Sequence, residues 1–115
     1  MSSTAHKARN AAECHALEQI PNIGRSLAAD LRLLGIDHPY QLTGRDAFVL
    51  YLSLCEKTGQ RQDPCVLDTF LAATDFMRGA PATPWWRYTA QRKLLYPDLG
   101  EPRAPTAQER SASIF

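Results

Sequence analysis

Residues 17–34 read LEQIPNIGRSLAADLRLL, and this stretch decides the fold. Pro21, Asn22 and Gly24 place three turn-favouring residues within four positions, so the chain must turn sharply there. Apolar residues then recur with the spacing of one helical face, at Leu27, Ala28, Leu31 and Leu34. The pattern predicts two short helices joined by a tight turn, a hairpin, with Gly35 ending the second helix.

The rest of the chain also has helical patterns. We expect a short helix at 11–18 before the turn and further helices at about 45–58, 64–78 and 85–95. Asp63-Pro64 and Thr83-Pro84 each place a capping residue before a proline, a pairing that favours the first turn of a helix. No alternation of apolar and polar residues typical of a strand persists. The sequence therefore predicts an all-α protein, a compact bundle of about five short helices.

Length and composition are those of one ordinary globular domain. The chain has 115 residues, 44% hydrophobic and 22% charged, enough to bury a core without a disulfide or a structural metal. We expect a helical domain at 11–96 between a flexible N-terminus at 1–10 and a flexible tail at 97–115. With 13 Lys and Arg against 12 Asp and Glu the net charge is +1, which excludes nucleic-acid binding driven by bulk positive charge.

The sequence carries no sign of secretion, membrane contact or a metal site. Its start has no apolar run typical of a signal peptide, and no apolar stretch approaches the ~18 residues that span a bilayer. We therefore expect a cytoplasmic protein with reduced thiols. Cys55 and Cys65 could approach each other and, with His38, hold zinc or form a redox pair. Structural zinc requires four ligands, so we predict no metal site.

The predicted hairpin has a chemical use. Its turn leaves the first N–H groups of the second helix unpaired, with the positive end of the helix dipole behind them, and a phosphate oxygen satisfies such groups. Gly24 has no Cβ, so a sugar-phosphate backbone can approach it closely. We expect Ile20 and Ile23 to anchor the turn in the core. The residues flanking the phosphate would be Arg25, Ser26 and Arg32.

This segment resembles the helix-hairpin-helix (HhH) family, whose members bind the DNA backbone. The resemblance, with the flanking residues above, implies phosphate contacts at Asn22, Gly24, Arg25, Ser26, Leu27 and Arg32. It implies structural roles in the hairpin for Leu17, Ile20, Pro21, Ile23, Ala28 and Leu31. In some members hairpin carbonyls hold a monovalent cation, and the corresponding positions here are Glu18, Ile20 and Ile23.

Asn22 departs from the HhH pattern, which usually has glycine at this position. Asparagine tolerates left-handed backbone better than other residues with a side chain, so the turn is kept. Its side chain, however, could crowd a phosphate. The substitution therefore bears on DNA affinity more than on the fold.

The chain is also similar to the small bacterial "pathogenicity locus" proteins, some of which are called mitomycin-resistance proteins. The similarity covers residues 17–93 and includes the hairpin, Leu50-Tyr51, Leu54-Cys55, Asp63-Pro64-Cys65-Val66-Leu67 and Trp85-Trp86. It implies a stand-alone HhH or SAM-like fold without a known reaction. HhH units often pair as a pseudo-duplicated (HhH)2 unit. The helices at 45–58 and 64–78 would then form the second unit, although their connector at 59–63 lacks the turn pattern.

We therefore predict a non-enzymatic DNA-binding protein. The hairpin would contact the phosphate backbone of duplex or single-stranded DNA without sequence specificity, in DNA repair or in resistance to mitomycin and other DNA damage. The sequence has no nucleophile with a base at a recognisable spacing and no paired acidic cluster, so we assign no catalytic residue. Asp30 and Asp68 are expected on solvated helix faces.

A protein–protein interaction module is the alternative, because the same turn also serves in SAM-like domains. The partner protein would bind the hairpin or the surface formed by Trp85–Tyr88. Neighbouring tryptophans on a helix face different directions, so we expect one of Trp85 and Trp86 in the core and the other on the surface. The sequence leaves the oligomeric state open.

Overall fold

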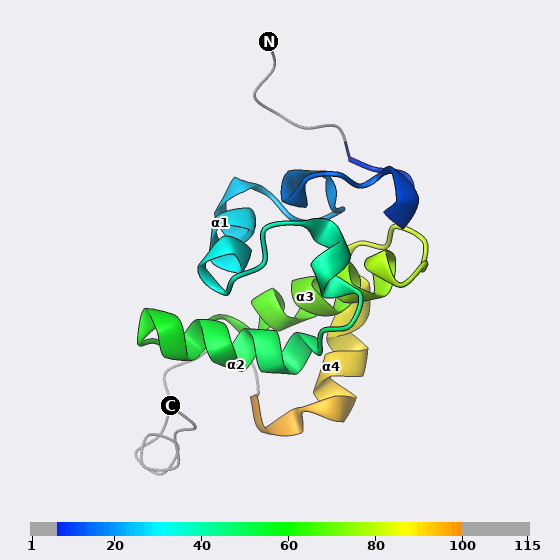
Figure 1. Ribbon diagram of the computed structural model, residues 1–115. Coiled ribbons are helices and arrows are strands. Elements are labelled where there is room, and N and C mark those ends of the chain that lie inside the picture. The colour runs from blue at the N-terminus through cyan, green and yellow to red at the C-terminus, as the bar shows by residue number, and fades with distance from the viewer. Residues whose placement is uncertain (1–6, 100–115) are drawn as a thin grey trace.

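The computed structural model describes residues 7–99, which fold into helices and connecting turns (Figure 1). Among these residues the α-helices are α1 (Arg25–Leu33), α2 (Ala47–Thr58), α3 (Pro64–Met77) and α4 (Thr89–Leu95). Short 3-10 turns connect or flank them: η1 (Ala11–Glu13), η2 (Leu17–Gln19), η3 (Pro39–Leu42), η4 (Trp85–Tyr88) and η5 (Pro97–Leu99). No strand occurs between residues 7 and 99, and the prediction of a small all-α bundle is confirmed.

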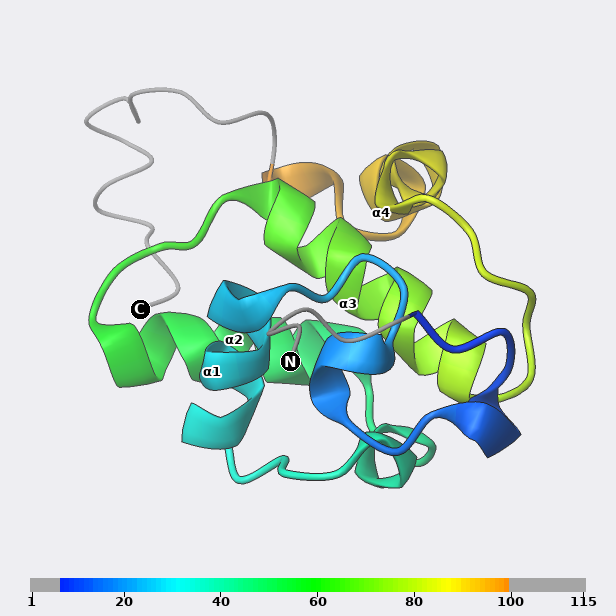
Figure 2. The same ribbon diagram turned by 90° about the horizontal axis from the view of Figure 1, so that it is seen from above.

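The central element of the bundle is α3. Eleven of its fourteen residues are buried, as in a helix that is packed on every side. α2, η3, η4 and α4 contact it. Both views place α3 in the middle, with α1 and α4 on opposite sides of it (Figures 1 and 2). The elements around α3 therefore share one apolar core.

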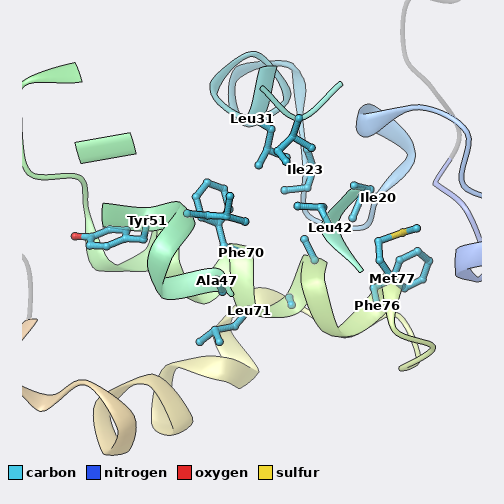
Figure 3. Close-up of a cluster of buried hydrophobic side chains, with 14 of the residues drawn as sticks. Ile20, Ile23, Leu31, Leu42, Ala47, Tyr51, Phe70, Leu71, Phe76 and Met77 are labelled. Carbon is cyan, nitrogen blue, oxygen red and sulfur yellow. The ribbon is translucent and has the colours of Figure 1, made fainter. Parts of the chain in front are cut away.

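The predicted hairpin is anchored in this core by its apolar residues. Ile20, Ile23 and Leu31 are fully buried and point into the same cluster as Leu42 and Phe70 (Figure 3). Burying one such side chain stabilises a fold by roughly 1.5–3 kcal/mol. The turn between Ile20 and Ile23 is thus held in a defined position while Gly24 beside it stays exposed.

Capping side chains mark where two of the helices begin. Asp46 precedes α2, and its carboxylate accepts the amides of Phe48 and Val49 at 2.9 and 3.1 Å. Asp63 precedes α3 and accepts the amide of Cys65 at 2.9 Å, with Pro64 at the first helical position. The predicted start at Asp63-Pro64 is confirmed. Aspartate accepts an unpaired helix amide, and proline at the first helical position needs no amide hydrogen bond.

The end of α1 also follows the sequence prediction. Gly35 has a φ of 87°, in the left-handed region that favours glycine. The amide of Ile36 then donates to the carbonyl of Leu31 at 2.9 Å, which closes the last turn. The Ile36 side chain is fully buried, so the chain leaves the helix toward the core.

An internal repeat relates the first two α-helices. η2 begins at residue 17 and α1 at residue 25, while η3 begins at residue 39 and α2 at residue 47, so both pairs are offset by 22 residues. We call residues 17–33 the first hairpin and residues 39–58 the second hairpin. The family resemblance suggested a second unit at 45–58 and 64–78. The structure instead pairs α2 with the 3-10 turn that precedes it, since 39–58 repeats the arrangement of 17–33.

The hydrogen bonds of the two hairpins repeat with the same offset. The Gln19 side chain accepts the amides of His15 and Ala16 at 2.8 and 2.9 Å. The Gln41 side chain accepts the amides of Asp37 and His38 at 2.8 and 2.7 Å. In the turns, the Ile23 amide donates to Ile20 and the Arg45 amide to Leu42, at 3.0 and 3.1 Å. Gln19 also explains why two 3-10 turns replace the helix predicted at 11–18, because its side chain takes amides that an α-helix would use.

The prediction of a solvated face at Asp68 is wrong. Asp68 is fully buried and pairs with buried Arg92, whose Nε lies 2.9 Å from its Oδ1. The Thr89 hydroxyl donates to Oδ2 at 2.8 Å. This cluster joins α4 to α3. Because other elements pack against α3 at this position, Asp68 has no contact with solvent and is stabilised by a charged partner instead.

The packed chain extends further at both ends than the predicted domain at 11–96. Ala8 and Leu99 are buried in the core. The remainder of the predicted flexible segments, 1–6 and 100–115, lies outside the described residues. Between residues 7 and 99, none of the helices combines the length and apolar character that crossing a bilayer requires.

Candidate functional site

The start of α1 presents backbone amides that lack partners. Gly24 is the N-cap residue and supplies no side-chain hydrogen bond. Among the hydrogen bonds formed within residues 7–99, none is donated by the amides of Arg25, Ser26 and Leu27. Gly24, Arg25 and Ser26 are exposed. The arrangement leaves N–H groups and the positive end of the helix dipole available to an anion.

The second hairpin shows how the same geometry accommodates an anionic group. Asp46 occupies the N-cap position that Gly24 has in the first hairpin. Its carboxylate accepts the amides of Phe48 and Val49, which correspond to those of Ser26 and Leu27 at the 22-residue offset. The second hairpin is therefore closed by its own carboxylate, whereas the first is open.

Gly24 is not required by the fold. Its φ of −91° is available to any residue, and a Cβ built there would meet no atom within 4 Å. A capping side chain at this position would fit and would satisfy the helix amides. The glycine therefore leaves the helix end uncovered without relieving any contact inside the protein.

Asn22 connects the turn to a distant loop. Its φ of 74° confirms that asparagine adopts the left-handed conformation that the turn needs. From the sequence alone, the Asn22 side chain could crowd a phosphate. In the structure the side-chain Nδ2 donates to the carbonyl of Thr83 at 2.8 Å. The amide group is thus bonded to the loop between α3 and η4.

The two arginines predicted to flank a phosphate have different surroundings. Arg25 is the exposed first residue of α1. Arg32 lies near the other end of the helix. Its two terminal guanidinium nitrogens each donate a hydrogen bond to the Glu18 carboxylate, both at 3.0 Å. Hydrogen bonding from Arg32 lowers the pKa of Glu18 below its usual range. Arg32 therefore links α1 to η2, and Arg25 supplies positive charge beside the open amides.

The other hairpin positions predicted from the sequence hold the turn in place. Five of them are fully buried, namely Leu17, Ile20, Ile23, Ala28 and Leu31. Pro21 is half-buried. The structure thus separates an apolar side of the hairpin, which enters the core, from the exposed side at Gly24.

The carbonyls suggested for a monovalent cation do converge on one point. Those of Glu18, Ile20 and Ile23 accept hydrogen bonds from the Lys7 ammonium, at 2.9, 3.1 and 2.7 Å. Partial burial lowers the pKa of Lys7 from its ordinary value. Lys7 could not be assigned to the hairpin from the sequence, because it lies in the segment expected to be flexible and no periodicity connects it to the turn.

Comparison with known proteins identifies the family. The pathogenicity locus (Cdd1) family matches residues 10–94, which include both hairpins and η4. The chain belongs to the pathogenicity locus family. A mitomycin resistance protein, McrB, from Streptomyces lavendulae is 44% identical over 97 residues, covering 84% of this chain and 92% of the relative. No solved structure matches the chain significantly. Lys7 precedes the first residue of this pathogenicity locus match.

The tryptophans of this pathogenicity locus protein lie outside the apolar core. Trp86 is 61% exposed, Trp85 is half-buried, and their rings meet edge to face at 5.8 Å. Tyr88 is the buried aromatic residue of η4. The expectation of one tryptophan in the core is wrong, because residues 85–88 form a 3-10 turn whose last residue, rather than either tryptophan, packs inward.

The cysteines do not assemble with other ligands in the described chain. Between residues 7 and 99 no group of three or more His, Cys, Asp or Glu side chains is arranged to hold a metal. The Cys55 sulfur accepts the amide of Gln62 at 3.3 Å. Burial, together with Asp63, raises the pKa of the Cys65 thiol to about 11. A thiol with this pKa remains protonated at neutral pH and is a weak nucleophile and ligand.

Proposed function

We propose that this pathogenicity locus protein is a non-enzymatic DNA-binding protein that contacts the phosphate backbone without sequence specificity. The contrast between the two hairpins carries the proposal. One hairpin places a carboxylate on its helix amides, and the other leaves the equivalent amides open beside Arg25. A phosphate oxygen has the charge and acceptor chemistry of the Asp46 carboxylate.

The charge of the protein fits a local contact of this kind. A net charge of +1 cannot attract DNA over long distances, so the affinity must come from few contacts. Backbone amides recognise phosphate without reading bases, which supports binding to any sequence. A protein that neutralises about three phosphates has a log–log salt slope of roughly −2.7, so its affinity falls perhaps fortyfold between 50 and 200 mM salt.

The biological role that we propose is resistance to mitomycin and other DNA damage. Its support is the 44% identical relative, which is named a mitomycin resistance protein. A backbone contact suits such a role, because damage arises in any sequence. We expect the protein to be located in the cytoplasm and to bind duplex or single-stranded DNA there.

The decisive experiment gives the first hairpin the cap of the second. Gly24→Asp should place a carboxylate on the amides of Ser26 and Leu27 and lower DNA affinity by on the order of 30- to 100-fold. Fluorescence anisotropy with labelled duplex and single-stranded DNA at 50 mM salt measures the loss. Thermal unfolding should show an unchanged or slightly higher Tm, because aspartate is a good cap and its Cβ meets no atom.

A neutral variant separates the cap from its charge. Gly24→Asn satisfies the same amides without adding negative charge, so it should also weaken binding. Gly24→Ala adds a methyl group without an acceptor and tests steric approach alone. Wild-type affinity in both the Asp and Asn variants would contradict the proposed site.

A protein-interaction module remains the second candidate, and the exposure of Trp86 beside exposed Arg87 favours it. The Asn22–Thr83 hydrogen bond connects this surface to the hairpin turn. The turn variant Asn22→Gly distinguishes the candidates, since on the DNA proposal it keeps or strengthens DNA binding. If neither wild type nor Asn22→Gly binds any DNA at 50 mM salt, the interaction module is the better account.

A further inference from the structure

We propose that the two tryptophans of η4 form a stacking site for an unpaired base, so that the protein binds single-stranded DNA more tightly than duplex. We call Trp85 and Trp86 the tryptophan pair. The inference rests on the proposed function, because it assigns the pair to the same DNA strand whose phosphate meets the start of α1. It adds what that function leaves open, namely which form of DNA the protein prefers.

The tryptophan pair presents aromatic surface that the fold does not use. Trp86 is 61% exposed and Trp85 is half-buried, and their ring planes stand at 83° to each other. Neither ring belongs to the apolar core, which η4 enters through Tyr88. Stacking requires an accessible ring face and tolerates any base, because every base has a flat aromatic face. The pair therefore has the exposure that a sequence-independent stacking site requires.

The chain on both sides of the tryptophan pair is held in place. Buried Tyr88 ends η4, and Pro84, with a φ of −60°, precedes it. The Thr83 hydroxyl donates to the Pro81 carbonyl at 2.9 Å, and the Thr83 carbonyl accepts the Asn22 side chain at 2.8 Å. Rings on a backbone that is already positioned lose less conformational entropy when a base stacks on them.

The Asn22–Thr83 hydrogen bond also connects the tryptophan pair to the open amides of the first hairpin. Gly24 lies two residues after Asn22, and Trp86 lies three residues after Thr83. Because an extended chain spans at most about 3.6 Å per residue, these two stretches measure at most roughly 7 and 11 Å. Single-strand sites on proteins cover about 4–16 nucleotides, so one strand can place a phosphate at Gly24 and a base at Trp86.

The charges of the segment around the tryptophan pair favour a nucleic acid. Between residues 79 and 96 the sequence has three basic residues and no acidic one, although the net charge of the chain is only +1. Arg87 is exposed directly after the pair, whereas Arg92 is buried against Asp68. Arg25 adds exposed positive charge at the start of α1. Aromatic surface combined with positive charge matches a single strand, whose bases stack and whose backbone is anionic.

The test compares the affinities of the full chain for labelled oligothymidine and for a labelled duplex of the same length, by fluorescence anisotropy at 50 mM salt. Wild type should bind oligothymidine about fivefold more tightly or better. Trp86→Ala should weaken oligothymidine binding about five- to thirtyfold and change duplex affinity less than about twofold, because paired bases are not free to stack. Trp86→Phe keeps a ring and should retain most of the wild-type affinity.

The intrinsic fluorescence of the wild-type protein reports on the tryptophan pair without any substitution. The chain contains two tryptophans, and both belong to the pair. Because a stacked base quenches tryptophan emission, unlabelled oligothymidine should quench the protein in a saturable manner, with the affinity found by anisotropy. The duplex should leave the emission nearly unchanged.

Two variants serve as controls. Tyr40→Ala removes another exposed ring, 66% accessible, from the second hairpin and should leave both affinities unchanged. Gly24→Asp should weaken binding to both DNAs, because both use the phosphate contact. Duplex binding that is sensitive to Gly24→Asp, together with oligothymidine binding that Trp86→Ala does not weaken, would overturn the inference and leave the proposed function standing. Binding of neither DNA would overturn both and leave the tryptophan pair as a surface for a protein partner.

Discussion

The first and second hairpins share a frame but differ at the start of their α-helices. Ile20 and Leu42 are both fully buried at equivalent positions, and both turns close with the same backbone hydrogen bond. Gly24 then leaves α1 uncapped, whereas Asp46 caps α2. The comparison shows that the buried positions determine the frame, while one exposed residue determines whether the helix amides are satisfied internally.

The hairpins differ also in how they are held at their carbonyls. Arg78 belongs to the central part of the bundle, since it follows α3, and it pairs with Asp75 as well. Lys7 comes from the segment before the first hairpin, and the carbonyls that it contacts, from Glu18 to Ile23, lie 11 to 16 residues later in the sequence. The second hairpin is therefore closed at its amides by its own Asp46 and at the carbonyls of Thr43 and Arg45 by Arg78, whereas the first is open at its amides.

The largest predicted effect concerns the helix ends, where the hairpins should behave alike. Gly35 and Gly59 have φ values of 87° and 70°. Valine is strained in this region, so Gly35→Val and Gly59→Val should each cost about 1–3 kcal/mol of unfolding free energy. Chemical denaturation measures both losses. An unchanged stability in either variant would show that its helix does not end in this conformation.

A smaller effect is expected at the open end of α1. Arg25→Ala should weaken binding to all DNA sequences about fivefold and make the log–log salt slope shallower by about one unit. Anisotropy titrations at several salt concentrations give both values. Arg45→Ala is a control for general loss of charge, since Arg45 is exposed but belongs to the capped hairpin. An equal effect of the two substitutions would remove the distinction between the hairpins.

The reciprocal change opens the second hairpin. Asp46→Gly should lower the unfolding free energy by a few tenths of a kcal/mol, because glycine is an acceptable N-cap. It should also expose the amides of Phe48 and Val49 to phosphate and raise DNA affinity about threefold. The same binding titration tests this gain. Weaker DNA binding in a folded Asp46→Gly variant would contradict the assumed equivalence of the helix ends.

The smallest effect is the pH dependence of the Glu18–Arg32 ion pair, which has no counterpart in the second hairpin among the described residues. Because the pKa of Glu18 is lowered in the folded state, its contribution is present above the ordinary glutamate pKa of about 4.3 and is lost as the pH falls through the lowered value. The Tm of wild type should therefore approach that of Glu18→Gln below this range. Parallel Tm curves of the two proteins at all pH values would contradict the contribution.

Local sequence signals accounted for the elements that neighbouring residues determine. The turn after Ile20, the end of α1 at Gly35 and the start of α3 at Asp63 were predicted, because turn formation and capping depend on a few adjacent residues. The second unit was placed wrongly. Its turn at Thr43–Gly44 lacks the pattern of the first hairpin, and the repeat became visible in the positions of the elements and in their hydrogen bonds.

By itself, the sequence determined that this protein is all-helical, that its chain turns sharply before α1 and that Gly24 and Arg25 stand at the start of that helix. Tertiary structure decided which polar groups are already satisfied. It brought Lys7 to the turn carbonyls and Arg92 to Asp68. The physical reason is that periodicity and capping act within a few residues, whereas a buried charge finds its partner through packing that joins distant segments.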